Sequence, residues 1–296
     1  MRKKDSGFTL AEVLVATVIG IISIAAAFAS YGYFNKSYKS ISQKANINNT
    51  AREALSILTK ELRNAGYVDP NYLANSPESN RTERTVRMDF ISVSSKRFGG
   101  KYGQSDYLQL WYANSSQQSR YITYYLRQYQ GGSKDYYLSR SVLINRHHPQ
   151  GGNQLIDNEL FIPYVEDFQV ILKDKDGNVI VPVCSSGCGS VESSQGIGNL
   201  VSTPYGQMNL GQANALKVHT AEVYVTLRSP KEVYSKPRKI QIQNGESPHG
   251  SNFTISSDKF HRETFFISVH TRNLATPQVQ VASSGQSISV GTGYNK

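Results

Sequence analysis

The stretch FTLAEVLVATVIGIISIAAAFA, residues 8–29, decides how this chain is organised. It is almost wholly apolar, and as a helix rising ~1.5 Å per residue it extends about 33 Å, enough to cross a bilayer. The preceding residues 1–4, MRKK, are basic, so the positive-inside rule predicts a cytoplasmic N-terminus and a translocated remainder. The sequence therefore predicts a membrane segment at residues 8–29.

Two features distinguish this segment from an ordinary secretory signal peptide. Such a peptide has an uncharged apolar run of about 7–15 residues, whereas this run is longer and contains Glu12. An ionisable side chain near the edge of a transmembrane helix costs on the order of a few kcal/mol unless it is paired. Glu12 is therefore a candidate functional residue that requires a partner.

The helix is predicted to continue far beyond the membrane segment, over residues 8–66. No proline precedes Pro70, and Gly66 with Arg63 before it suits a helix C-terminus. In the second half, apolar residues recur at steps of four and three, which predicts a face packed against a head, while Glu61 is expected on another face. This apolar stripe consists of Ala51, Leu55, Leu58, Leu62 and Ala65.

Residues 67–274 are predicted to form a β-rich globular head, because β-favouring segments alternate there with turn signals. Asp176-Gly177-Asn178 marks a tight hairpin turn. The last residues, 275–296, are rich in Ser, Gly, Gln and Val and are expected to form a flexible tail, with an added edge strand near residues 279–281 as the alternative. Strands are expected near residues 86–94, 107–112, 121–127, 136–143, 164–173, 179–183, 217–227 and 264–271.

The sequence contains only two cysteines, Cys184 and Cys188. A translocated head meets an oxidising compartment, which favours a small disulfide between them. A metal site or a redox pair is less favoured, because there is no second cysteine pair, no nearby histidine and no C-x-x-C spacing.

No catalytic motif was found. The sequence lacks G-x-S-x-G, H-E-x-x-H and nucleotide-binding glycine motifs, so we predict neither an enzyme nor a bound cofactor. The formal charge of +10 is spread along the chain, which favours a solvated basic surface over a specific nucleic-acid site. No metal site is predicted, because only two of the six histidines are adjacent and four are scattered: His147 and His148, then His219, His249, His261 and His270.

The N-terminal residues 4–15, KDSGFTLAEVLV, resemble the prepilin signature of type IV pilins. The resemblance implies that a prepilin peptidase removes leader residues 1–7 by cutting between Gly7 and Phe8, and that Phe8 is then N-methylated. It also implies that Glu12 pairs with the amine of a neighbouring subunit and gives register during assembly, since an unpaired charge is penalised in lipid.

Further blocks are similar to PilW-type minor pilins. They imply an α+β, type IV pilin-like fold with one long helix packed on an antiparallel sheet, and a minor pilin that initiates or caps a pilus (fimbrium). The implied partners are other pilins and an inner-membrane assembly platform. The implied location is a single pass through the inner membrane with the head in the periplasm, and later the cell surface. The blocks are residues 51–55, 62–67, 124–126, 165–170, 266–269 and 272–273.

Two alternatives remain at this point. A J-type pseudopilin of type II secretion shares the leader and the long helix. In a different class, Ala27-Phe28-Ala29 offers an A-x-A signal-peptidase site, which would leave a secreted β-rich binding module or enzyme that begins at Ser30.

Processing can be tested with Gly7→Leu. A bulky side chain at the cleavage position is expected to block leader removal, leaving a precursor heavier by residues 1–7. Mass spectrometry of the N-terminal peptide measures this, and the unmodified chain should begin at an N-methylated Phe8. A chain beginning at Ser30, or unchanged processing of the variant, would contradict the assignment.

Overall fold

The structure is a computed structural model that describes most, but not all, of the chain. Gly7, Cys184, Cys188 and the tail residues 275–296 lie outside the described residues, so the predicted cleavage position, disulfide and tail remain predictions. The described ranges are residues 8–67, 69, 91–94, 99–100, 103–115, 118–129, 135–146, 154–181, 200–203, 206–242 and 253–274.

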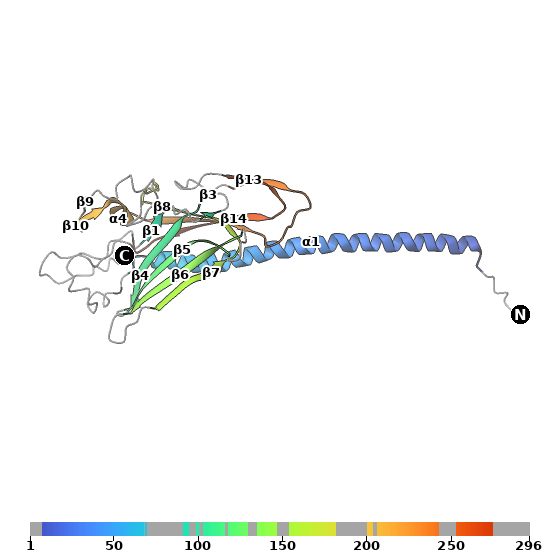
Figure 1. Ribbon diagram of the computed structural model, residues 1–296, viewed down its shortest axis with the longest axis horizontal. Helices are drawn as coiled ribbons and strands as arrows, with labels where there is room; N and C mark the ends of the chain where they lie inside the picture. The colour runs from blue at the N-terminus through green and yellow to red at the C-terminus, as the bar shows by residue number, and fades with distance from the viewer. Residues whose placement is uncertain are drawn as a thin grey trace, which may run out of the picture. The chain divides into compact units, whose positions relative to one another are not determined.

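The predicted long N-terminal helix is confirmed as α1 (Leu10–Asn64), which runs without interruption for 55 residues (Figure 1). Neither Gly20 nor Gly32 breaks it. The helix ends as expected, because Gly66 adopts a φ of 76°, a left-handed conformation that glycine takes without steric cost. Contacts divide the chain into two units, residues 1–46 and 47–296, with the division inside α1.

The C-terminal part of α1 carries the predicted apolar stripe into the core of the head. All five stripe residues, together with Ile47 and Ala54, are buried. The expectation for Glu61 is wrong, because this residue is only 5% exposed. The buried face is wider than the stripe alone, and Glu61 is tolerated there because the head supplies partners for its carboxylate.

The larger sheet has five strands in the order β1-β4-β5-β6-β7, and every neighbouring pair is antiparallel. Along β5 the side chains of Ile122, Tyr124 and Leu126 alternate toward the core, the period-2 pattern of a strand with one buried face. The strands are β1 (Ile91–Ser94), β4 (Tyr107–Ser115), β5 (Gln118–Gln128), β6 (Tyr136–Arg146) and β7 (Gln154–Ile162).

A second antiparallel sheet has the order β14-β11-β8, formed by β8 (Val165–Lys173), β11 (Thr220–Arg228) and β14 (Arg262–His270). β8 lies at its edge but is buried along nearly its whole length. Asp106 satisfies backbone groups of this edge. Its N–H donates to the Phe168 carbonyl at 2.9 Å, and its carboxylate accepts the Val170 N–H at 2.7 Å. The segment before β4 thus links the two sheets.

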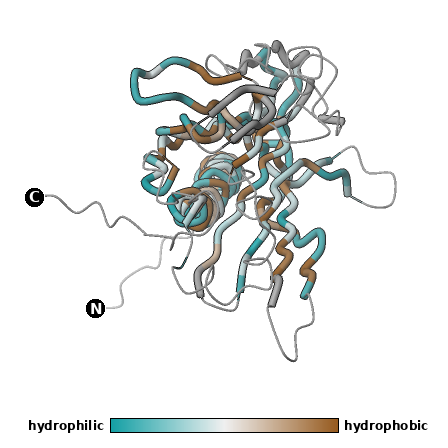
Figure 2. Tube along the Cα trace, turned by 90° about the vertical axis from the view of Figure 1, so that its left-hand side faces the viewer, coloured by the Kyte–Doolittle hydropathy of each residue, from teal (hydrophilic) through white to brown (hydrophobic). Residues whose placement is uncertain are grey.

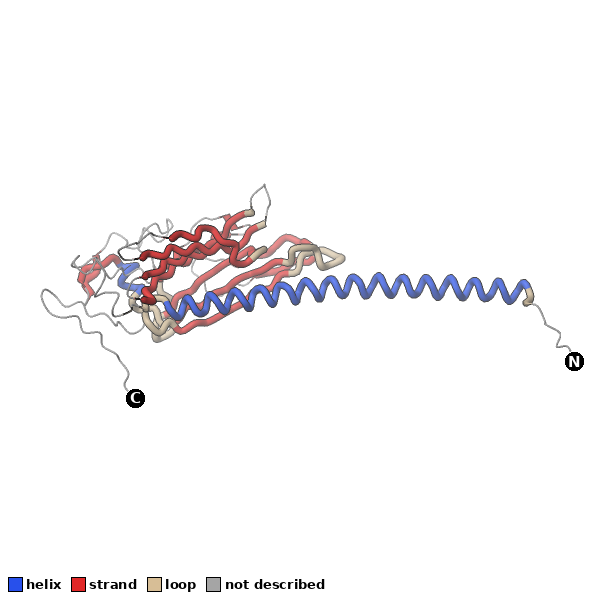
Figure 3. The backbone as a smooth tube through the Cα atoms, turned by 90° about the horizontal axis from the view of Figure 1, so that it is seen from below, coloured by secondary structure: helices blue, strands red, loops and turns tan. Residues whose placement is uncertain are grey.

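The remaining described elements are short (Figure 3). They form three two-stranded antiparallel pairs and one short helix. These are β2 (Gly99–Gly100) with β3 (Gly103–Gln104), β9 (Leu200–Thr203) with β10 (Gly206–Asn209), β12 (Arg238–Ile242) with β13 (Phe253–Asp258), and α4 (Leu210–Ala215).

Most predicted strands correspond to observed ones, but the strand expected at residues 179–183 is wrong. Within its described residues there is only an isolated bridge between Lys173 and Val179. The hairpin turn before it is present: the Asp174 carboxylate accepts the N–H groups of Asp176 and Asn178, each at 2.9 Å, and Gly177 has a φ of 85°. β7, α4 and the three two-stranded pairs were not predicted from the sequence.

One hydrophobic core joins the end of α1 to both sheets, and it includes the fully buried side chains of Leu58, Tyr124 and Phe168. In Figure 2 the strands of the head lie around this end of the helix, with hydrophobic segments among them. The chain then continues along β4, because the Gly66 N–H donates to the Trp111 carbonyl at 2.9 Å. The helix end is therefore fixed by packing and by backbone hydrogen bonds.

A buried polar network holds α1 on the larger sheet. The Tyr124 hydroxyl donates to one oxygen of Glu61, and Arg140 Nη2 lies 2.5 Å from the other. Burial and then the Glu61 charge hold the pKa of Tyr124 well above its usual range. Burial alone would lower the pKa of Arg140, but the hydrogen bond and charge of Glu61 raise it. Arg140 therefore remains charged in the folded protein.

Removing the carboxylate with Glu61→Ala should destabilise the head by about 3–5 kcal/mol, because it leaves Arg140 buried without its main partner. The matched control is Glu159→Ala, which removes the exposed second partner of the same arginine and should cost less than about 1 kcal/mol. Urea unfolding of the detergent-solubilised chain, followed by the fluorescence of its single tryptophan, Trp111, measures both. Equal losses in the two variants would contradict this role for Glu61.

Candidate functional site

The first part of α1 is covered with exposed apolar side chains. An 18-residue window in this helix is long and apolar enough to cross a membrane, and none of that window is buried in protein. Water is a poor environment for such a surface, so it requires lipid or other apolar helices. The exposed side chains are Phe8, Leu10, Val13, Leu14, Val15, Val18, Ile19, Ile21, Ile22, Ile24 and Phe28.

Two hydroxyl groups within this surface are satisfied by the helix itself. Thr17 Oγ1 donates to the carbonyls of Val13 and Leu14 at 3.0 and 2.8 Å, and Ser23 Oγ donates to the Ile19 carbonyl at 2.8 Å. These bonds remove most of the cost of placing the hydroxyls in a hydrocarbon environment. Glu12 remains as the charged group of the segment.

Thr9 and Glu12 form a capping box at the start of α1. The Thr9 N–H and hydroxyl donate to Glu12 Oε2 at 2.8 and 2.9 Å, and the Glu12 N–H donates to Thr9 Oγ1 at 3.3 Å. This reciprocal pattern satisfies N–H groups that the first turn of a helix leaves without partners. This capping role of Thr9 and Glu12 was not predicted from the sequence, although the spacing T-x-x-E before an apolar run is the signature of a capping box.

The capping box leaves part of the Glu12 carboxylate available. Both bonds from Thr9 reach Oε2, and within the described residues Oε1 accepts no hydrogen bond. Phe8, the predicted new N-terminus, immediately precedes the cap and is 88% exposed. The two predicted assembly residues, Phe8 and Glu12, therefore lie about one helical turn apart, with one carboxylate oxygen open to a partner.

Aromatic side chains follow the apolar surface along α1. Tyr31, Tyr33, Phe34 and Tyr38 are all at least 66% exposed, and the Tyr33 and Phe34 rings contact each other edge-on. Tyrosine is enriched at membrane–water interfaces, where its ring is in the apolar layer and its hydroxyl is hydrated. Their position just beyond residue 29 agrees with the predicted end of the membrane segment.

The same N-terminal segment is the part of the chain that matches a known family. Residues 2–28 match the family described as "Prokaryotic N-terminal methylation motif". The chain carries a prokaryotic N-terminal methylation motif. The matched residues include Gly7, Phe8 and Glu12 and most of the predicted leader.

Comparisons of the whole chain are less informative. A comparison with curated protein sequences finds no match. Among solved structures, a type IV-like pilin, TTHA1219 from Thermus thermophilus, is similar over 77% of this chain and 97% of that chain, with 14% identity and a TM-score of 0.43. At this TM-score the similarity supports no argument about function.

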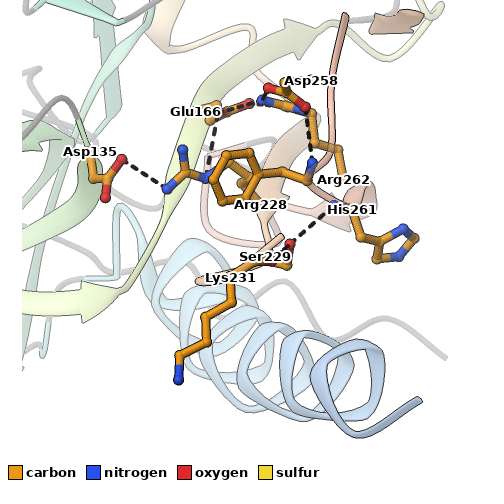
Figure 4. Close-up of polar contacts among 9 residues, drawn as sticks. Asp135, Glu166, Arg228, Ser229, Lys231, Asp258, His261 and Arg262 are labelled. Carbon is orange, nitrogen blue, oxygen red and sulfur yellow. Dashed lines mark hydrogen bonds and ion pairs between the residues drawn. The ribbon is translucent and has the colours of Figure 1, made fainter. Parts of the chain in front are cut away.

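Beyond the methylation motif, the largest group of charged side chains is a buried chain of ion pairs in the head (Figure 4). Glu166 on β8 binds Arg262 on β14 through two contacts, at 2.5 and 3.0 Å, and Arg262 also binds Asp258 through two contacts of 2.6 Å. Arg228 lies 3.8 Å from Glu166 and 2.8 Å from Asp135. The chain of pairs therefore joins β8, β11, β13 and β14 to the start of β6.

The two arginines of this ion-pair cluster are buried. The Arg262 side chain is 1% exposed, and the Arg228 guanidinium lies 4.0 Å from the centroid of the Phe260 ring. Burial alone would lower the pKa of Arg262, but its bonds to Asp258 and Glu166 raise it, so the arginine remains charged. Asp135 and Asp258 at the ends of the cluster are partly exposed, but both arginines are buried and paired, an arrangement that is typical of a structural cluster.

The described residues contain no group of three or more His, Cys, Asp or Glu side chains that could hold a metal ion. They do bring together two histidines that the sequence analysis treated as scattered. His219 and His270 are in direct contact because β11 and β14 pair. No sequence pattern of spacing identifies such a pair, since 51 residues separate its members.

Asp167, next to Glu166 on β8, is another buried acid. Its carboxylate accepts hydrogen bonds from Gln169 at 2.9 Å and from Ser105 at 3.4 Å. Burial raises the pKa of Asp167 to about 6, against the opposing effect of these bonds. Ionisation in the folded state is therefore unfavourable below about pH 6.

The raised pKa predicts how stability depends on pH. Between about pH 4 and pH 6 the folded state binds more protons at Asp167 than the unfolded state does, so stability falls as pH rises through this window, by on the order of 2–3 kcal/mol. Asp167→Asn should remove this decrease, so the variant should be more stable than the unmodified chain at pH 7.5 and about equally stable at pH 4. The exposed turn variant Asp176→Asn is the control. Thermal unfolding at both pH values tests this, and parallel pH profiles for Asp167→Asn and the unmodified chain would contradict it.

Proposed function

We propose that this protein is a type IV pilin-like subunit, and specifically a minor pilin that joins a pilus through α1 and helps initiate or cap the filament. Its role is structural, not catalytic. Prepilin peptidase cuts between Gly7 and Phe8 and methylates the new Phe8 amine. Before assembly the chain spans the inner membrane once, at residues 8–29, with its head in the periplasm.

The observation that carries this proposal is the exposed apolar surface at the start of α1, which lies within the methylation motif. An anchor in lipid alone requires only an apolar helix. The presence of the ionisable Glu12 in that helix indicates a second environment, in which a positively charged group is its partner. The methylated amine of Phe8 on a neighbouring subunit provides such a charge, and Glu12 Oε1 is available to accept it.

The assignment to the PilW-type minor pilins rests on blocks of sequence at the end of α1 and in the head. Several of their residues contact the end of α1 or each other's strands: Tyr124 donates to Glu61, and Asn273 Nδ2 donates to the Arg63 carbonyl at 2.9 Å. Glu166, in a further block, is the centre of the buried ion-pair cluster. The blocks therefore lie where α1 and the strands of the head meet, a location expected of residues that a pilin fold requires.

The two alternatives differ in how they use α1. A J-type pseudopilin uses the same anchor, and the blocks in the head are what favours the pilus. Cleavage after Ala29 would remove the capping box and the apolar surface, yet α1 continues through Ser30 without interruption to Asn64. A single continuous helix favours processing at its start, between Gly7 and Phe8.

The role of Glu12 can be separated from its capping role with two variants. Glu12→Ala removes both the charge and the cap, whereas Glu12→Gln keeps a capping side chain and removes only the charge. Both variants should insert into the membrane normally. If the charge pairs with a neighbouring amine, both should be reduced at least about tenfold in sheared filaments, which is roughly the loss of a 1.4 kcal/mol interaction.

Quantitative immunoblots of sheared pili, normalised to the membrane fraction, measure this reduction. Glu53→Gln, an exposed acid on the same helix, is the matched control and should assemble normally. Normal recovery of Glu12→Gln with loss of Glu12→Ala would assign Glu12 to capping alone. Normal recovery of both variants would remove the residue from assembly altogether.

A further inference from the structure

His219 and His270 meet at one end of the three-stranded sheet. β11 begins at Thr220, which pairs with His270 at the end of β14, and His219 immediately precedes Thr220. The two Nε2 atoms lie 2.8 Å apart, and the ring centroids are separated by 3.9 Å with the ring planes at 79°. His270 is exposed and His219 is partly buried, so the pair is open to solvent on one side.

The backbone holds both histidines in place. The His219 N–H donates to the Lys173 carbonyl at 2.8 Å, and the His219 carbonyl accepts the Thr271 N–H at 2.9 Å. The side chain of Thr271 adds a bond to the Val218 carbonyl at 3.1 Å, and both of these neighbouring residues are fully buried. The backbone positions of the two histidines are thus fixed by the sheet and its core, which keeps the two side chains side by side.

The imidazoles present their nitrogen atoms in the form that a metal ion binds. His219 Nδ1 lies 3.4 Å from Thr220 Oγ1, so a proton on Nδ1 can point toward the hydroxyl and leave the Nε2 lone pair free. The contact between the two Nε2 atoms places a proton on one of them, and movement of that proton to Nδ1 of the same ring frees the second nitrogen.

The separation of the two nitrogens fits a shared metal ion. Two imidazole nitrogens bound at ~2.0–2.1 Å, with an angle of 90–109° at the metal, lie about 2.9–3.4 Å apart. The observed Nε2 separation of 2.8 Å is close to this range, and the ring centroids, now 3.9 Å apart, must move apart as both nitrogens turn toward one ion. Imidazole suits Cu²⁺, Ni²⁺ and Zn²⁺, whereas Mg²⁺ and Ca²⁺ prefer oxygen ligands.

We propose that His219 and His270 form a surface site for a divalent transition-metal ion, with water in the remaining coordination positions. Cu²⁺ binds most tightly, following the general order of affinity of nitrogen sites for divalent metals. Charges nearby moderate the affinity: Arg272 repels a cation, while Lys173 is paired with Glu222 at 2.8 Å. A bound ion crosslinks the start of β11 to the end of β14. This inference does not depend on the proposed assembly role.

The test uses the full-length chain in detergent after treatment with a chelator. Titration calorimetry with CuCl2, NiCl2, ZnCl2 and MgCl2 should show one equivalent of Cu²⁺ bound, weaker Ni²⁺ and Zn²⁺, and no Mg²⁺. His219→Gln and His270→Gln should each weaken Cu²⁺ binding by at least roughly tenfold, because loss of even an outer hydrogen-bond partner of a metal ligand costs 10–100-fold. The double variant should be little worse than either single variant.

The matched control is the double variant His147→Gln with His148→Gln, which removes the other histidine pair of the sequence and should retain the Cu²⁺ site. Unchanged binding in His219→Gln, or loss of binding only in this control, would overturn the proposal. Electron paramagnetic resonance of the unmodified chain with one equivalent of Cu²⁺ provides a measurement that needs no variant. Two coordinated imidazole nitrogens support the site, and one or none contradicts it.

Discussion

The first part of α1 carries an apolar helical surface, with a single acid near its start, whose side chains are exposed in the described part of the chain. Water cannot solvate such a surface without a large cost, and its hydroxyl groups are already bonded to the helix backbone. The segment therefore requires a non-aqueous environment. Lipid satisfies the apolar side chains, and in the proposed filament the helices of other subunits replace it. Glu12 makes the second environment specific, because an acid in that surface favours neighbours that bring a positive charge.

The head meets a different requirement, which is to hold two sheets and the end of a helix in one core. It does so by burying charged groups in pairs at the junctions. Glu61 joins α1 to the larger sheet, Asp106 bonds to the edge of β8, and the ion-pair cluster around Glu166 joins the smaller sheet to β6 and β13. Buried pairs add little stability compared with apolar packing, but a mismatch in any of them would leave an unpaired charge. An arrangement of the sheets that separated these groups from their partners would therefore be penalised.

The sequence predicted those features that depend on local pattern. The stripe from Ala51 to Ala65 and the cap at Gly66 follow from helix periodicity and from the conformational freedom of glycine, and both are present. The strands with alternating or β-branched residues were found to within a few residues. β7 was missed because its apolar residues Leu155, Ile156 and Leu160 do not alternate with polar ones. All three are exposed, so no buried face imposes such a pattern. The burial of Glu61 and the contact of His219 with His270 depend on partners more than 50 residues away, which no local pattern encodes.

The capping box at Thr9 has a consequence for the kinetics and selectivity of assembly. A glutamate side chain in solution samples many rotamers, and fixing it on binding costs conformational entropy. Here Thr9 already holds one oxygen of Glu12 in place, while the other remains open. Much of that entropy is therefore lost when the helix forms, before any neighbour arrives, and less is left to lose at the moment of docking. An incoming subunit in the proposed filament would meet a carboxylate of defined direction, so an amine that approaches at the wrong height along the helix would gain little from it.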